Sequence, residues 1–249
     1  MSQVLHALDG WYMLHDFRTI DWSSWRARSK EERQAALDEL SSLLAEWKQI
    51  EDQNEGSTAL YTIVGHKADL LFLNLRPALE DLGKVETALN KTKIAESMFS
   101  GYSYLSVVEL GNYLPREGFD PYQDPAIRNR LYPKLPQTNN ICFYPMNKKR
   151  EGNDNWYSLP LEQRRELMRA HGLTGRQYAG KVTQIVSGST GLDDWEWGVT
   201  LFSDDPIQFK RIVYEMRFDE VSARYGEFGE FLVGSRLTSE QVSPYFEVK

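Results

Sequence analysis

One histidine in the second half of the chain is a candidate metal ligand. His171 follows the charged stretch EQRRELMRA and precedes Gly172. At helical spacing it shares a face with Leu167 and Met168, so we expect its ring to point toward the core or a pocket. Two interpretations stay open at this point. A positive imidazole could cap a helix that stops at Gly172, or a neutral imidazole could be the axial ligand of a haem iron.

A tyrosine and a lysine in the run ICFYPMNKKR (141–150) are candidates for redox or acid–base chemistry. In an extended strand, Cys142, Tyr144 and Met146 face one way. Tyr144 is either a strand-end tyrosine with its hydroxyl in water or a redox-active or acid–base group beside a cation. Lys148 is either that cation or a solvated surface residue.

Four further polar residues could contribute to a binding site. Gln184 lies in the strand-like stretch KVTQIVSG and shares a face with valines, so it is either a polar group inside an apolar pocket or a mixed-face strand residue. Arg130 and Arg176 offer planar guanidinium groups suited to carboxylates, and the alternative for both is a surface position. Ser222 is the fourth candidate.

An internal repeat supplies the elements that would position these residues. Each copy has a strand, a charged helix, a hairpin, a second helix and a closing strand. The first copy uses residues 11–17, 30–47, 59–75, 77–96 and 102–110, and the second uses 141–146, 161–171, 181–203, 205–226 and 230–237. The order β-α-β-β-α-β predicts an α+β fold of two tandem ferredoxin-like repeats, with antiparallel sheets that pack into a barrel and helices outside.

The repeats also predict the domain organisation. We expect an N-terminal ferredoxin-like domain over 1–110 and a C-terminal, ligand-binding one over 141–249. The stretch 111–140 between them is rich in proline and asparagine, which is typical of a linker, and we expect one short helix in it near 125–131.

Composition narrows the cellular setting. The 249 residues carry a formal net charge of −7, which argues against nucleic acid or anionic lipid as a partner. The single cysteine excludes an internal disulfide and fits a reducing compartment. We find no signal sequence and no apolar stretch of roughly 20 residues, so we expect a cytoplasmic protein without a membrane span.

Several longer strings resemble those of the coproheme decarboxylases, the Gram-positive clade of the chlorite-dismutase superfamily. The resemblance covers nearly the whole chain and is weakest at 26–58, at 114–120 and after residue 236. The strings are LDGWYMLHDFR, GHKADLLF, ALNKTKIAE, YSYLSVVEL, RLYP, ICFYPMNKKR, NWYSL, RAHG, YAGKVTQIVSGSTGLDDWEWGVTLFSDD and YEMRFDEVSARYGEFG.

This resemblance implies an activity. The substrate and redox cofactor would be Fe-coproporphyrin III (coproheme), and hydrogen peroxide would be the oxidant. Two propionates would become vinyl groups, with haem b as the product. The resemblance also implies a homopentamer and transient contact with a ferrochelatase that delivers coproheme. A porphyrin carrier without turnover is the alternative.

The resemblance also implies residue roles. His171 would be the axial iron ligand, Tyr144 the redox tyrosine and Lys148 an electrostatic or proton-supplying group. Gln184 would lie on the distal side, where relatives that break chlorite need an arginine, so we do not expect chlorite breakdown as the main activity. The residues that would hold propionates are Arg130, Tyr144, Pro145, Met146, Asn147, Lys148 and Ser222. Further pocket members would be Arg176, Tyr113 and Trp156.

Overall fold

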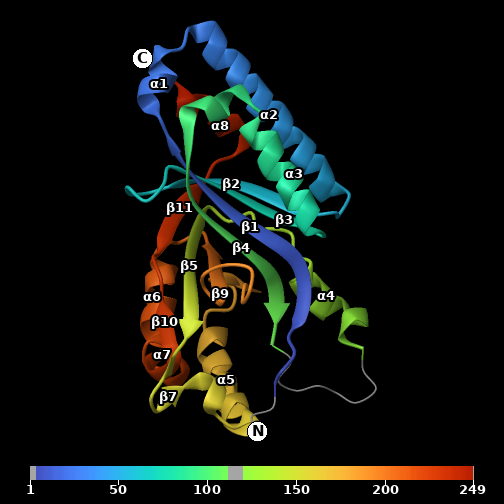
Figure 1. Ribbon diagram of the computed structural model, residues 1–249, viewed down its shortest axis with the longest axis vertical. Coiled ribbons are helices and arrows are strands. Elements are labelled where there is room, and N and C mark those ends of the chain that lie inside the picture. The colour runs from blue at the N-terminus through green and yellow to red at the C-terminus, as the bar shows by residue number, and fades with distance from the viewer. Residues whose placement is uncertain (1–3, 112–119, 249) are drawn as a thin grey trace. The chain divides into compact units, whose positions relative to one another are not determined.

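The computed structural model of the protein describes residues 4–111 and 120–248 and divides into two compact units (Figure 1). Unit 1 comprises Met1–Gly10, Ser106–Leu131 and Pro136–Val233. Unit 2 comprises Trp11–Leu105, Tyr132–Leu135 and Gly234–Lys249. The two units interleave along the chain, whereas the division predicted from the repeats is sequential. That predicted division stays a prediction, as does the barrel.

Unit 2 is built on an antiparallel sheet that contains the first repeat. Its strand order is β11–β2–β3–β1–β4, in which β2, β3, β1 and β4 have the ferredoxin-like arrangement. The strands are β1 (Leu8–Ile20), β2 (Ser57–Ile63), β3 (Leu70–Arg76), β4 (Met98–Leu110) and β11 (Leu232–Arg236). The helices are α1 (Trp22–Ala27), α2 (Lys30–Asp52), α3 (Leu79–Asn90) and α8 (Ser239–Phe246), with the 3₁₀ turn η1 (Lys93–Ser97).

The helices α1 and α2 of unit 2 begin where side chains satisfy free backbone groups, at Asp21 and Ser29 respectively. Ser29 and Glu32 form a capping box at the start of α2. The helices α2 and α3 lie side by side, and they contact β2 and β3 respectively (Figure 1). The interior between them is apolar and includes Trp47 and Phe72. Hydrophobic burial therefore orders this unit.

A histidine lies in the interior of unit 2. The His15 side chain is 0% exposed, stacks on Phe17 at a centroid distance of 6.4 Å and meets the ring of Tyr104 at 6.1 Å. Burial lowers the pKa of His15 to about 3, although a backbone hydrogen bond with Tyr104 opposes the shift. The imidazole is therefore neutral in the folded protein at neutral and mildly acidic pH.

The buried His15 predicts an acid sensitivity of the fold. In the unfolded chain this imidazole takes a proton below a pH of about 6.5, and in the folded chain it does not, so folding loses stability as the pH falls. We expect the free energy of unfolding to drop by about 1.4 kcal/mol per pH unit between roughly pH 6 and 4. Urea titrations at several pH values measure this slope. His15→Leu should flatten it, and the exposed His66→Leu should leave it unchanged; equal slopes in all three proteins would contradict the prediction.

Unit 1 contains most of the second repeat. Its sheet runs β4–β8–β9–β5, and β10 and β11 both neighbour β5. The further strands are β5 (Asn140–Lys148), β8 (Thr183–Gly188), β9 (Trp197–Ser203) and β10 (Gly226–Phe228), with a small hairpin of β6 (Arg150–Glu151) and β7 (Asp154–Asn155). The helices are α4 (Pro125–Leu131), α5 (Leu161–Arg176), α6 (Ile207–Met216) and α7 (Glu220–Tyr225), with the turns η2 (Pro121–Gln123) and η3 (Trp156–Ser158).

The structure confirms the α+β class, with an antiparallel sheet and packed helices, and the short helix predicted near 125–131. Two predicted helices differ in ways that affect the site. The helix predicted to stop at His171 continues to Arg176, and the glycine in the left-handed conformation is Gly180, with φ +78°, rather than Gly172. The helix predicted over 205–226 is broken into α6 and α7, because the Asp219 side chain caps a new helix start.

Among the described residues, no helix combines the length and the apolar character needed to cross a membrane.

Candidate functional site

One face of the unit 1 sheet gathers several of the candidate residues. On β5, Cys142, Tyr144 and Met146 alternate onto the same face. The register pairs Cys142 with Leu201 of β9, and Leu201 with Gln184 of β8. Directly paired residues share a face, so Gln184 lies on the Tyr144 face, two strands away. Its side chain is exposed there, so the structure does not place it inside an apolar pocket.

Tyr144 lies among aromatic side chains. Its side chain is 9% exposed and stacks on Phe231 at a centroid distance of 4.4 Å, with Phe228 at 6.0 Å. Burial raises the pKa of Tyr144 well above its usual value, and the nearby Arg217 opposes this only in part. The phenol therefore keeps its proton throughout the neutral range, which suits a group that gives up and regains a whole hydrogen atom.

Lys148 ends β5, and its position in the strand alternates onto the same face as Tyr144 and Met146. Its Nζ lies 5.0 Å from the ring centroid of Trp156, which begins η3. Burial lowers the pKa of Lys148 to about 8, against the opposing charges of Asp219 and Glu196. Lys148 is thus a cation that can release a proton close to neutral pH, with an aromatic face beside it.

His171 lies inside α5 and pairs with a carboxylate from α7. Its Nδ1 is 2.6 Å from Oδ2 of Asp219, and 26% of the His171 side chain remains exposed. Burial lowers the pKa of His171, while the hydrogen bond and charge of Asp219 oppose the shift. With Nδ1–H donated to Asp219, the Nε2 lone pair is available to a metal ion, which is the usual arrangement of a metal-binding histidine. The helix-capping interpretation is wrong, because the helix continues for five residues beyond His171.

Asp219 is a site residue that the sequence patterns did not reveal. It is the N-cap of α7, where its Oδ2 accepts hydrogen bonds from the backbone N–H and the hydroxyl of Ser222, both at 3.2 Å. The same oxygen contacts His171. The spacing of Asp219 and Ser222 is typical of an N-cap at a helix start. The predicted continuous helix over 205–226 places both residues inside a helix and therefore leaves no N-cap at Asp219.

Substitutions of Asp219 should separate its two roles. The asparagine side chain in Asp219→Asn can still cap α7 but carries no charge, so we expect the fold to persist and the pKa of His171 to fall further, since Asp219 raises it. Asp219→Ala should show the same shift and also lose about 1 kcal/mol of stability with the cap. Imidazole nitrogen NMR and urea titration measure the two effects, with the exposed His66 as internal reference. An unchanged His171 titration would remove the electrostatic role of Asp219.

The other predicted residues are spread over unit 1. Pro145, Met146 and Asn147 lie on β5, and the Pro145 carbonyl accepts the Gly229 N–H at 2.9 Å. Trp156 packs edge-on against Tyr225 at 5.4 Å, in an apolar cluster that includes Leu167 and Met168 of α5.

The structure does not bring all predicted residues together. Arg130 lies on α4, where its side chain is exposed. Tyr113 falls outside the described residues. Their roles stay predictions.

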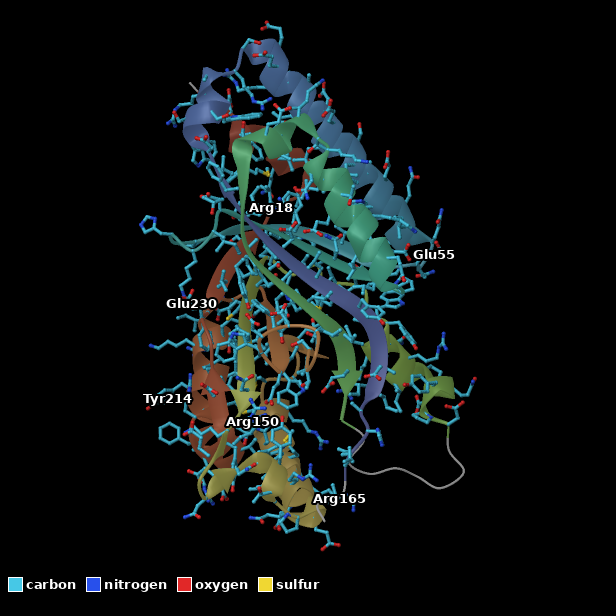
Figure 2. The ribbon with its side chains drawn as sticks, viewed as in Figure 1. Arg18, Glu55, Arg150, Arg165, Tyr214 and Glu230 are labelled. Carbon is cyan, nitrogen blue, oxygen red and sulfur yellow. The ribbon has the colours of Figure 1, made fainter. Side chains whose placement is uncertain are left out.

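A hollow of about 640 Å³ lies along α5. His171, Tyr144, Lys148 and Gln184 are not among its lining residues, which in the described part of the chain are Gly111, Glu162, Arg165, Glu166, Met168, Arg169, Gly172 and Arg176. Figure 2 labels Arg165, which comes from this helix. The volume lies within the roughly 300–1,000 Å³ of small-molecule sites, and guanidinium groups favour carboxylates there.

Among the described residues, no group of three or more His, Cys, Asp or Glu side chains is placed to hold a metal ion.

Comparison with known proteins gives the family. Residues 33–237 match the family model described as chlorite dismutase, so the chain belongs to the chlorite dismutase family. The structure is similar to that of a heme-binding protein from Thermus thermophilus, with 52% sequence identity, a TM-score of 0.95 and coverage of 99% of this chain and 98% of that one. It also shares its fold with chlorite dismutase from Candidatus Nitrospira defluvii in complex with imidazole, at 20% identity and a TM-score of 0.77, covering 96% of this chain and 95% of that one.

Proposed function

We propose that the protein is a coproheme decarboxylase. In each of two rounds, one propionic acid side chain and one hydrogen peroxide would give a vinyl group, carbon dioxide and two waters. The substrate, Fe-coproporphyrin III, would thereby become haem b. The proposal includes a cytoplasmic homopentamer that receives its substrate from a ferrochelatase.

The observation that carries the proposal is the pair of His171 and Asp219. An imidazole whose Nδ1 is engaged at 2.6 Å by a carboxylate, and whose protonation is disfavoured by burial, is suited to bind iron through Nε2. A single protein ligand is sufficient for a porphyrin iron, because the macrocycle supplies the other nitrogens. The bound iron porphyrin, together with peroxide, would supply the oxidising equivalents.

The remaining groups fit a reaction at propionate side chains. Tyr144 is buried and keeps its phenolic proton, so it can lose a hydrogen atom and then take one from the propionate chain. Lys148 can hold the carboxylate ionised before carbon dioxide leaves, and can release or accept a proton near neutral pH. The three arginines along α5 offer further carboxylate partners for a substrate with four propionates.

The similar Thermus thermophilus protein supports the ligand class. Its description is that of a heme-binding protein, and it is 52% identical over nearly the whole chain. This similarity supports a tetrapyrrole ligand here and leaves the chemistry to be decided by Tyr144 and Lys148.

Gln184 argues against chlorite as the main substrate, even within the chlorite dismutase family. It lies on the Tyr144 face of the sheet, and its neutral amide offers an oxyanion no permanent charge. We expect the haem-loaded protein to evolve oxygen from chlorite at least about a hundredfold more slowly than an arginine-bearing chlorite dismutase, as an oxygen electrode would measure. Gln184→Arg should raise the rate if Gln184 limits it. Comparable rates in the two wild-type proteins would contradict this expectation.

The deciding experiment adds coproheme and then hydrogen peroxide to the purified protein. We expect carbon dioxide, a three-propionate intermediate and then haem b, detected by mass spectrometry. Tight binding of coproheme with no product would identify a porphyrin carrier instead. Failure to bind either coproheme or haem b would overturn both assignments.

A further inference from the structure

The end of β5 is held from both sides. On one side, β10 pairs Gly226 with Lys148. On the other side, β9 starts at Trp197 opposite Met146, so the ladder of backbone hydrogen bonds does not reach Lys148. Glu196 supplies the missing acceptor: the Oε2 atom of Glu196 accepts the Lys148 backbone N–H at 2.8 Å. The Glu196 side chain therefore makes the hydrogen bond to Lys148 that a neighbouring strand would otherwise make.

Further contacts fix Glu196 itself. Its backbone N–H donates to Oδ1 of Asn147 at 2.8 Å, and its carbonyl accepts the Ser189 N–H at 2.8 Å. Its Oε1 lies 3.7 Å from the guanidinium of Arg150, which is labelled in Figure 2. Glu196 is only 7% exposed. Burying a carboxylate is costly unless it is paired, and here the Lys148 N–H and the Arg150 guanidinium offset that cost.

We propose that Glu196 is a positioning residue for the decarboxylation: its carboxylate accepts the Lys148 backbone N–H at the end of β5 and keeps a negative charge near the Lys148 ammonium, which lies over Trp156, where a substrate propionate would meet it. The inference rests on the proposed function, because that function gives Lys148 its task. Glu196 touches no reacting atom in this account and acts only through Lys148.

The charges around Lys148 agree with this role. Asp219 from α7 and Glu196 from the segment before β9 both favour the protonated lysine, against its burial. His171 on α5 interacts electrostatically with Lys148 as well, and Arg150 lies close to the Glu196 carboxylate. Removing the Glu196 charge should therefore increase the fraction of Lys148 that is unprotonated at neutral pH.

The test uses Glu196→Gln, which keeps an acceptor oxygen and removes the charge. Its matched control is Glu227→Gln, because Glu227 is exposed on β10 and lies opposite Asn147 in the register. Acetylation of Lys148 by acetic anhydride in the full chain without porphyrin, read by peptide mass spectrometry at pH 7, reports the unprotonated amine, with the exposed Lys210 as internal reference. We expect roughly threefold to tenfold faster labelling of Lys148 in Glu196→Gln and no change in Glu227→Gln.

A second variant and a second readout complete the test. Glu196→Asp keeps the charge but withdraws it by one methylene, so its labelling rate should lie between those of the wild type and Glu196→Gln. In turnover with coproheme and peroxide, the alkaline limb of the pH profile should move to lower pH in Glu196→Gln, move less in Glu196→Asp and stay in place in Glu227→Gln. Equal labelling of Lys148 in the wild type, Glu196→Gln and Glu196→Asp would overturn the inference. Altered labelling in a protein that releases no carbon dioxide would instead overturn the proposed function and leave the coupling of Glu196 to Lys148 intact.

Discussion

Tyr144→Phe is expected to bind coproheme within about threefold of the wild type and to decarboxylate it at least about a hundredfold more slowly. The substitution removes one hydroxyl from an aromatic stack with Phe231 and Phe228 and leaves the ring in place. Binding should survive because the ring packing survives. Turnover should be lost, because phenylalanine has no phenolic hydrogen atom to give up. Absorbance titration with coproheme gives the affinity, and product mass spectrometry gives the rate.

The control for this prediction lies in the same apolar cluster. Tyr178 is 5% exposed and packs with Cys142 and Tyr144 in unit 1. Tyr178→Phe makes the same chemical change close by, and we expect near-normal turnover from it. A Tyr144→Phe protein that converts coproheme at the wild-type rate would refute the hydrogen-transfer role. Equal losses in both variants would point to a general effect on packing instead.

His171→Ala is expected to weaken coproheme binding by at least about tenfold, or about 1.4 kcal/mol, and to abolish decarboxylation. The variant removes the Nε2 lone pair and leaves Asp219 without its imidazole partner. The Soret band should change, because the iron loses its axial nitrogen. Added imidazole should restore part of the wild-type spectrum.

The exposed His66 supplies the control here, since His66→Ala removes an imidazole from unit 2 at a turn between β2 and β3. Its spectrum and turnover should match those of the wild type. An unchanged Soret band in His171→Ala, with coproheme bound, would exclude His171 as the iron ligand. The assignment of the substrate would then need another axial residue.

Local sequence patterns predicted the elements better than they predicted the contacts between them. The alternation in ICFYPMNKKR placed Tyr144 on the same face as Cys142, because side chains in a strand alternate between faces whatever surrounds them. The helix at 125–131 was also predictable, since it begins with a proline, which is favoured at the first position of a helix. Such features depend on a few neighbouring residues.

The missing parts of the site depend on residues far apart in sequence. His171 and Asp219 are 48 positions apart, and so are Lys148 and Glu196. The pattern of residues within one helix or strand cannot predict a contact between residues so far apart in the sequence. The break before α7 is not predictable from periodicity either, because apolar residues continue at helical spacing through 205–226. The Asp219 side chain nevertheless hydrogen-bonds the backbone of the next turn and so starts a new helix.

The shared oxygen of Asp219 makes the first turn of α7 and the orientation of an imidazole one thermodynamic unit. Any ligand that engages Nε2 of His171 and so stabilises the His171–Asp219 contact should also make the opening of α7 less favourable, by the reciprocity of linked equilibria. Amide hydrogen exchange at Ser222 would then fall when a porphyrin is added, although that residue's backbone need never touch it. Conversely, mutations that destabilise the first turn of α7 would lower the affinity for a ligand bound to His171, even without contacting that ligand.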